Sequence, residues 1–159
     1  MSLAAAVITV SDRSSRGERA DASGPIAVAA LREAGFDVGD AIIVPDGADE
    51  VERILQATLQ RGIRLIVTTG GTGIGPRDRT PEGTTRVLER EIPGIAEELR
   101  RRGAAQKPAA LLSRGLAGVV GDALIVNLPG STAAVTDGIR LVLEIAKHTL
   151  GQLEGEDHR

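Results

Sequence analysis

The feature that most constrains the fold is a regular alternation between short apolar runs and amphipathic segments. Continuous apolar runs at 4–10, 41–45 and 65–69 have the length and composition of strands that are buried on both faces of a sheet. Elsewhere apolar residues recur every three or four positions, most clearly over 51–59, which is typical of a helix with one buried face. Because strands that alternate with helices favour a parallel sheet, the sequence predicts a three-layer α/β fold with helices on both faces.

The second half of the chain adds a hairpin to this pattern. Gly121-Asp122 separates the apolar runs 116–120 and 123–128, which is typical of a β-hairpin and predicts one antiparallel pairing in a mostly parallel sheet. Thr80 and Ser131 are each expected to cap the helix that follows, because a side-chain oxygen at that position accepts a hydrogen bond from a free backbone N–H group.

Length and charge describe one ordinary globular domain. The 159 residues predict a single domain over 1–150 and a flexible polar tail over 151–159. A net charge of −3 gives no reason to expect nucleic acid or an anionic membrane as a partner. No apolar run approaches the roughly 20 residues of a membrane helix. The first residues lack the basic segment of a signal peptide, so we expect a cytoplasmic protein.

Two residue types are nearly absent, and this excludes several chemistries. The chain has no cysteine, so disulfides, thiolate metal ligands and a cysteine nucleophile are excluded. Phe36 is the only aromatic residue, whereas proteins that bind single-stranded nucleic acid stack bases on several rings. A flat heterocycle would therefore be held by backbone amides, carboxylates and apolar edges. His148 and His158 lie near the end of the chain and do not suggest a zinc site.

Small or acidic residues follow four of the expected strands. These are Asp12, Asp46, the loop at 70–80, and Gly130-Ser131. In open α/β sheets, ligands bind at the carboxyl ends of the strands. The four segments are therefore expected to meet in one binding site.

The loop GGTGIG at 70–75 matches neither the Walker loop nor the dinucleotide-binding pattern. Its glycines, including Gly70, Gly71 and Gly73, would nevertheless let backbone N–H groups approach an anion, and Thr72 adds a hydroxyl group. Taken alone, the pattern is equally consistent with a tight turn.

Two aspartates are candidate magnesium ligands. Asp46 and Asp78 are expected on neighbouring loops beside the glycines, where carboxylates could hold Mg²⁺ against a triphosphate. Arg77 and Arg79 flank Asp78 and could contact phosphate oxygens, and Asp12 could add a third polar contact. Each residue could instead be an ordinary turn or exposed loop residue.

Two further features have simpler interpretations that remain open. Ser131 could bind an anion at a helix N-terminus or serve only as an N-cap. The basic run Arg100-Arg101-Arg102 is expected to be a solvated helix end, because Glu97 and Glu98 precede it.

These segments together resemble the molybdopterin-binding proteins of molybdenum cofactor synthesis. The segment TTGGTGIGPRDRTPE at 68–82 resembles the signature of that family. The other matching segments are TVSDR at 9–13, SGP at 23–25, IVPD at 43–46, REIPG at 90–94, LLSR at 111–114 and LIVNLPGS at 124–131. The resemblance covers roughly residues 4–150.

The family contains the bacterial MogA and MoaB proteins and a domain of gephyrin. The resemblance implies a molybdopterin adenylyltransferase, which transfers AMP from Mg-ATP to the terminal phosphate of molybdopterin and releases pyrophosphate. It implies that Asp46 and Asp78 are catalytic and bind Mg²⁺. The residues that it implies for substrate binding are Asp12, Gly70, Gly71, Thr72, Gly73, Arg77, Ser113, Gly130 and Ser131.

The resemblance leaves two alternatives to catalysis. Some MoaB-type members lack the activity, so the chain could be a non-catalytic molybdopterin carrier or scaffold. The homologous domain of gephyrin is a structural trimerisation module, a role compatible with catalysis. The family also implies a homotrimer, with contacts to molybdopterin synthase and to the protein that inserts molybdate.

Overall fold

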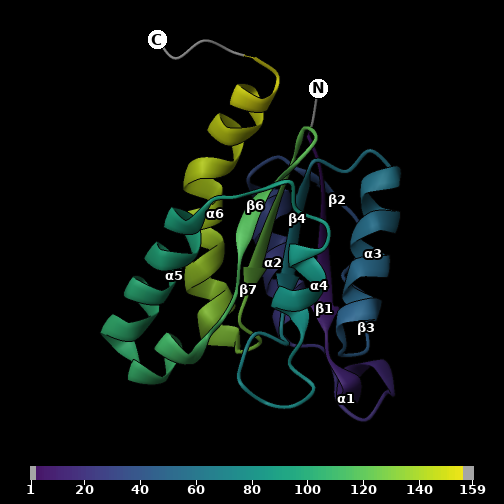
Figure 1. Cartoon of the computed structure of the whole chain (residues 1–159), viewed down its shortest axis with the longest axis vertical. Coiled ribbons are helices and arrows are strands. Elements are labelled where there is room, and N and C mark those ends of the chain that lie inside the picture. Colours follow the sequence, from purple (N-terminus) through teal and green to yellow (C-terminus); the bar gives the residue numbers. More distant parts are fainter. Residues whose placement is uncertain (1–2, 156–159) are drawn as a thin grey trace.

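The computed structural model describes residues 3–155, and within them seven strands form one sheet. The strands are β1 Ala4–Val10, β2 Asp37–Val38, β3 Ile42–Val44, β4 Leu65–Thr69, β5 Arg90–Glu91, β6 Ala117–Val120 and β7 Ala123–Leu128. The helices are α1 Asp12–Ser15, α2 Ser23–Glu33, α3 Ala48–Gln60, α4 Thr80–Thr85, α5 Pro93–Gln106 and α6 Thr132–Leu153, with a 3₁₀ turn η1 at Pro108–Leu112. The helices flank the sheet on both sides (Figure 1), as the sequence predicts.

The centre of the sheet is parallel. Its order is β2-β1-β4-β7-β6-β5, and β3 also pairs with β1. Strand β1 runs parallel to β2, β3 and β4, and β4 runs parallel to β7. The register places Val7 opposite Val67 and Val67 opposite Val126. The mostly parallel α/β fold predicted from the sequence is therefore confirmed.

The far edge of the sheet differs from the prediction. The expected hairpin is present, since β6 pairs antiparallel with β7. Strand β5 then adds a second antiparallel pairing, with Arg90 opposite Val119. Its two residues, Arg90 and Glu91, are exposed and carry no apolar run, so periodicity could not reveal them.

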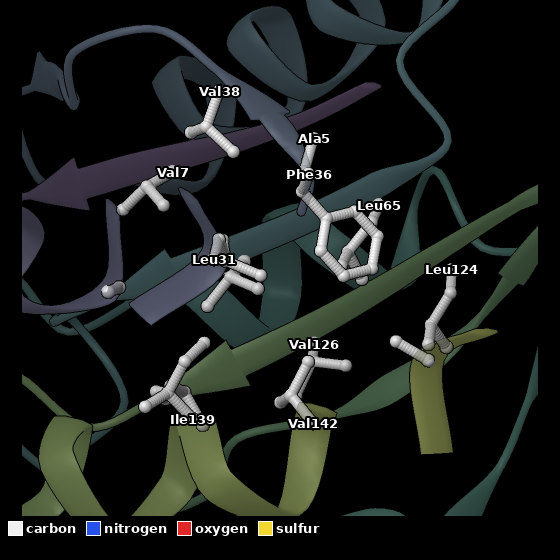
Figure 2. Packing of buried hydrophobic residues seen from close by; sticks show 14 of the residues in the cluster. Ala5, Val7, Leu31, Phe36, Val38, Leu65, Leu124, Val126, Ile139 and Val142 are labelled. Atoms are coloured by element: carbon white, nitrogen blue, oxygen red, sulfur yellow. The ribbon is translucent and has the colours of Figure 1, made fainter. Parts of the chain in front are cut away.

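Alternating side chains of the strands form two apolar layers. Val7, Val67 and Val126 belong to one cluster, which includes residues of α2, α5 and α6. Figure 2 shows this layer, with strand side chains directed toward those of α2 and α6. Ile8 and Ile66 belong to the second cluster, which includes residues of α3. Burying a side chain of this size contributes about 1.5–3 kcal/mol, so both layers fix the helices on the sheet.

The two expected helix caps have different outcomes. Ser131 is the N-cap of α6, and its hydroxyl oxygen accepts a hydrogen bond from the N–H of Ala134 at 3.1 Å. Thr80 is not a cap, because α4 begins at Thr80 itself. Its hydroxyl donates instead to the carbonyl oxygen of Gly70 at 2.9 Å. The tertiary contact replaces the local one.

The predicted boundary of the tail needs correction. Helix α6 continues to Leu153, and Gly151 is buried. The guanidinium of Arg64 donates to the carbonyl oxygen of Leu150 at 3.1 Å and pairs with Glu154. This contact extends the ordered helix beyond residue 150, and the rest of the predicted tail, 156–159, lies outside the described residues. No helix within residues 3–155 has the length and apolar content needed to cross a membrane.

Candidate functional site

The candidate site lies at the carboxyl ends of β1, β3 and β4, where successive connections lead to opposite sides of β1. Strand β1 has β3 on one side and β4 on the other, so the connections from these strands separate at their carboxyl ends. Such a switch point leaves a crevice in parallel α/β sheets. Figure 1 shows α1, which follows β1, and the loop after β4 at the same end of the sheet.

Asp12 and Asp46 are joined by reciprocal hydrogen bonds. The N–H of Asp12 donates to Oδ2 of Asp46 at 2.9 Å, and the N–H of Asp46 donates to Oδ1 of Asp12 at 3.1 Å. The pairing of β1 with β3, which sets Val10 opposite Val44, positions both turns. Two loops that are 34 residues apart in sequence therefore form one acidic unit.

Arg77 closes this unit from the glycine-rich loop. Its Nε and Nη2 donate to the two carboxylate oxygens of Asp12, each at 3.1 Å. Nη2 also donates to the carbonyl oxygen of Asp46 at 2.8 Å. The Arg77 side chain is 63% exposed, so solvent or a ligand can compete for it.

The two aspartates have opposite electrostatic environments. The hydrogen bonds from Arg77 lower the pKa of Asp12, with burial as an opposing effect. Burial is the main cause of a raised pKa at Asp46, and the carboxylates of Asp12 and Asp78 add to it. Asp46 is therefore the carboxylate of this pair that a nearby cation would stabilise most.

Asp78 is held inside its own loop. Its Oδ2 accepts a hydrogen bond from the N–H of Gly75 at 3.0 Å. A Cβ atom at Gly73 or Gly75 would lie only 2.9 or 2.8 Å from the same oxygen. The two glycines thus allow the carboxylate to fold back over the loop, and larger residues at either position would displace it.

Gly70 and Gly71 adopt backbone conformations that favour glycine, with φ of +89° and +68°. A Cβ atom at Gly70 would meet the carbonyl oxygen of Val10 at 2.3 Å, and one at Gly71 would meet Oγ1 of Thr80 at 2.2 Å. The loop therefore begins as a tight turn that is pressed against β1. This structural role is compatible with anion binding, which stays a prediction.

Two cavities meet at the start of this loop, and both are lined by Gly70, Gly130 and Ser131. The first has a volume of about 500 Å³ and is also lined by Ser11, Arg19 and Asp21. The second has a volume of about 450 Å³. Its other lining residues include Gly71, Thr72, Gly73, Asp78, Lys107, Leu112, Ser113 and Asp137.

All of the residues expected from the sequence lie at this end of the sheet. Ser113 donates a hydrogen bond from its hydroxyl to Oγ1 of Thr72 at 3.2 Å, which joins η1 to the glycine-rich loop. Ser131 is exposed at the rim of both cavities, although its hydroxyl caps α6. Asp12 and Asp46 form the acidic unit, and Arg77 is bound to both. The unit lies beside the glycines, because a Cβ atom at Gly71 would be 3.1 Å from Oδ1 of Asp46.

The fit to Mg²⁺ depends on two carboxylates. Within residues 3–155, no group of three or more acidic or histidine side chains is arranged to hold a metal ion. Magnesium is often bound by only one or two carboxylates, with substrate phosphates and water completing its coordination. Oδ1 of Asp46 and Oδ1 of Asp78 accept no hydrogen bond within the described part of the chain. These two residues therefore fit an ion that arrives with a phosphate ligand.

Sequence analysis missed three residues that support the site. Asp21 accepts hydrogen bonds from the hydroxyl of Thr9 at 2.7 Å and from the N–H of Gly24 at 3.0 Å. Arg114 and Glu82 form an ion pair, with Nη1 at 2.9 Å from Oε1, and Arg114 also donates to the glycine-rich loop. Arg114 is 32 residues from Glu82 in sequence, so local spacing carried no signal for this pair.

The basic run on α5 also needs correction. Arg100 donates to the carbonyl oxygens of Ser113 and Gly115 at 3.3 and 3.1 Å. Arg102 pairs with Glu144 on α6 at 3.1 Å. Two of these three arginines therefore tie α5 to neighbouring elements, and the run is more than a solvated helix end.

Comparison with known proteins agrees with this geometry. A family model described as "Probable molybdopterin binding domain" matches residues 6–148. The molybdenum cofactor biosynthesis bifunctional protein of Chlorobaculum tepidum is 37% identical over 96% of this chain, and the chain spans about half of that protein, 49%. The molybdopterin adenylyltransferase of Haemophilus influenzae is 36% identical over 82% of this chain and 68% of its own length.

A solved structure shares the whole fold. The molybdopterin biosynthesis enzyme MoaB of Thermus thermophilus is 40% identical, covers 99% of each chain and superposes with a TM-score of 0.89. The family match spans most of the chain, including all four strand ends of the site. The chain therefore belongs to the molybdopterin-binding family of molybdenum cofactor biosynthesis.

Proposed function

We propose that the protein is a molybdopterin adenylyltransferase. In this reaction an oxygen of the terminal phosphate of molybdopterin attacks the α-phosphorus of ATP. The bond between that phosphorus and the oxygen bridging to the β-phosphate breaks, and pyrophosphate leaves. The observation that carries the proposal is the placement of Asp46 and Asp78 beside the same glycine-rich loop, because phosphoryl transfer between two anions requires neutralised charge and fixed geometry.

No strong general base is needed, because the attacking phosphate is already ionised at neutral pH. The carboxylates of Asp46 and Asp78 would hold Mg²⁺, which would neutralise phosphate charge when bound. The raised pKa of Asp46 reflects burial and neighbouring carboxylates, and a cation would relieve both effects. These two side chains therefore orient the phosphates and provide no proton.

The two cavities offer room for two substrates. Both volumes, about 500 and 450 Å³, lie within the range of about 300–1,000 Å³ that is typical of ligand pockets. The cavities share Gly70, Gly130 and Ser131, so substrates bound in both would bring their phosphates together there. Backbone N–H groups of the glycine-rich loop would contact those phosphates. Arg77 lines neither cavity, and its exposed guanidinium would contact phosphates that extend toward Asp12 and Asp46.

The decisive experiment is pyrophosphate release from Mg-ATP, measured with and without molybdopterin. The proposal requires release that depends on molybdopterin, together with an adenylated pterin product. Binding of molybdopterin without any pyrophosphate would instead identify the non-catalytic carrier that the resemblance left open.

Assembly and partners are further parts of the proposal. We expect a homotrimer, as the family implies, and native mass spectrometry would overturn this by showing a monomer at all concentrations. A trimer would be compatible with catalysis and with a structural role. Contacts with molybdopterin synthase and with the molybdate-inserting protein, and a cytoplasmic location, stay predictions.

A further inference from the structure

One arginine outside the cavities holds both ends of the segment 72–78 within the glycine-rich loop at 70–80. Nε of Arg114 donates to the carbonyl oxygen of Gly73 at 2.8 Å, and Nη2 donates to the carbonyl oxygen of Asp78 at 2.7 Å. The backbone N–H of Arg114 donates to the carbonyl oxygen of Thr72 at 2.7 Å. Arg114 therefore binds backbone carbonyl oxygens at both ends of the segment 72–78.

Glu82 fixes the orientation of this arginine. Nη1 of Arg114 donates to both carboxylate oxygens of Glu82, at 2.9 and 3.0 Å. The hydrogen bonds from Arg114 lower the pKa of Glu82, so Glu82 stays ionised at neutral pH. All three guanidinium nitrogens are engaged, and the planar group has little freedom to turn away from the loop.

The segment needs this support because of its composition. Gly73 and Gly75 lose more backbone entropy on ordering than other residues do. Asp78 lies at the end of the segment, and among residues 3–155 only the N–H of Gly75 donates a hydrogen bond to its carboxylate. Hydrogen bonds from Arg114 to the carbonyl oxygens of Gly73 and Asp78 fix the backbone before Gly75 and at Asp78, the two residues that this hydrogen bond joins.

We infer that Arg114 is a positioning residue for Asp78, with Glu82 orienting its guanidinium group. Neither Arg114 nor Glu82 lines the two cavities, so Arg114 acts through the loop and not on a substrate. The inference rests on the proposed function, because it assigns Asp78 a task in turnover. Lysine at position 114 would keep the charge but lose the planar guanidinium that binds Gly73, Asp78 and Glu82 at once.

The test compares Arg114→Lys with Arg86→Lys. Arg86 is a matched control, because it pairs with the two carboxylates of Asp49 and Glu52, and no hydrogen bond or ion pair joins it to the loop within the described part of the chain. Since misplacing a reacting group by about 1 Å costs up to about 100-fold, Arg114→Lys should lower kcat roughly 10- to 100-fold, with the KM for molybdopterin nearly unchanged. The control should keep the rate of the unmodified protein.

A double-mutant cycle with Asp78→Asn shows whether Arg114 acts through Asp78. In the Asp78→Asn background, Arg114→Lys should reduce the remaining rate by less than about twofold, because residues that act as one unit are not additive. An unchanged kcat in the single variant, or an equal loss in both backgrounds, would overturn the inference.

Amide hydrogen exchange gives a readout that does not need turnover. Arg114→Lys should speed exchange at residues 73–78 and leave β4 unchanged. If the unmodified protein released no pyrophosphate, the proposed function would fail, and faster exchange would still support the ordering of Asp78 by Arg114. Unchanged exchange at 73–78 would refute that ordering.

Glu82→Gln serves as the second variant if Arg114→Lys does not unfold cooperatively. It removes the charge of the partner and keeps a hydrogen-bond acceptor. Its loss of kcat should be roughly two- to fivefold, because the guanidinium keeps its bonds to the loop carbonyls. No loss in either kcat or loop protection would overturn the orienting role of Glu82.

Discussion

At the scale of single residues, two neighbouring carboxylates have pKa values shifted in opposite directions because their surroundings differ. Asp12 is paired with Arg77, which favours its ionised form. Asp46 shares the reciprocal backbone hydrogen bonds with Asp12, but within residues 3–155 no guanidinium donates to its carboxylate, and burial disfavours its charge. If Asp46 binds a cation as proposed, its ionised carboxylate is expected to lower the free energy of unfolding of the protein without ligand.

Asp46→Asn should therefore stabilise the protein at neutral pH while abolishing turnover. The pKa of Asp46 is higher in the folded protein than in the unfolded chain. The free energy of unfolding therefore falls as pH rises between the two pKa values, and the ionised carboxylate is destabilising above them. We expect Tm to rise by roughly 1–3 °C at pH 7, because about 1 kcal/mol corresponds to 2–4 °C in a domain of this size and solvent screens part of the effect.

The advantage of Asp46→Asn should disappear in acid, where the native carboxylate is protonated. Asp40→Asn is the control, since the side chain of Asp40 is 98% exposed and its ion pair with Arg32 contributes little. Thermal unfolding between pH 4 and pH 8 measures both. A lower Tm for Asp46→Asn at pH 7 would contradict this account of Asp46.

Asp78→Asn should separate turnover from folding. An asparagine can still accept the hydrogen bond from Gly75, so the loop should keep its conformation and molybdopterin should still bind. Loss of the charge should lower kcat by roughly 100-fold or more, as for other groups that stabilise charge during transfer. A full rate with Mg²⁺ would show that Asp78 is not a catalytic ligand.

At the scale of elements, the contact between β1 and the start of the glycine-rich loop fixes the site. Gly70 donates its N–H to Leu128 of β7 at 3.0 Å and leaves no room for a side chain beside Val10 of β1. The turn after β4 is therefore held between its two neighbouring strands. A side chain at Gly70 would push these strand ends apart.

Gly70→Ala should destabilise the protein by roughly 2–4 kcal/mol. The left-handed backbone at φ +89° costs alanine about 1–2 kcal/mol, and the contact with a backbone oxygen adds strain. Gly94→Ala is the control, because open space surrounds that position in the first turn of α5. Urea unfolding of both variants measures the difference, and equal midpoints would refute the close approach.

The elements differ in how well their patterns predicted them. Strands β1, β3 and β4 and helix α3 were predictable, because burial on one or both faces imposes a clear period on their residues. Strands β2 and β5 were not, since each has only two residues and no period can be seen in two. The cap at Thr80 was mistaken because its hydroxyl bonds across the loop to Gly70.

At the scale of the whole molecule, Arg64 joins three distant parts at the end of the sheet opposite the site. It precedes β4, and its guanidinium donates to carbonyl oxygens of Asp122 in the hairpin and Leu150 in α6, both at 3.1 Å. Only 14% of its side chain is exposed. The long-range hydrogen bonds of this residue lie away from the loops of the candidate site.

Arg64→Ala should lower stability by roughly 1–3 kcal/mol without changing kcat, because the carbonyl oxygens of Asp122 and Leu150 and the carboxylate of Glu154 lose their donor. Arg53→Ala removes an arginine that is 68% exposed and pairs with Glu50 of the same helix, so it should change stability by less than about 0.5 kcal/mol. Thermal unfolding and pyrophosphate release check both variants. A loss of kcat in Arg64→Ala would show that the two ends of the sheet are coupled.

What the sequence by itself determined is local: the periods of the main strands and helices, the residues at each strand end, and the family segments that contain Asp46 and Asp78. Only the tertiary structure decided which of these residues touch. The reciprocal bonds of Asp12 and Asp46, and the bonds from Arg114 to Gly73, join residues 34 and 41 positions apart. Such contacts follow from the order of strands in the sheet, and periodicity records whether a side chain is buried but not which strand or loop lies beside it.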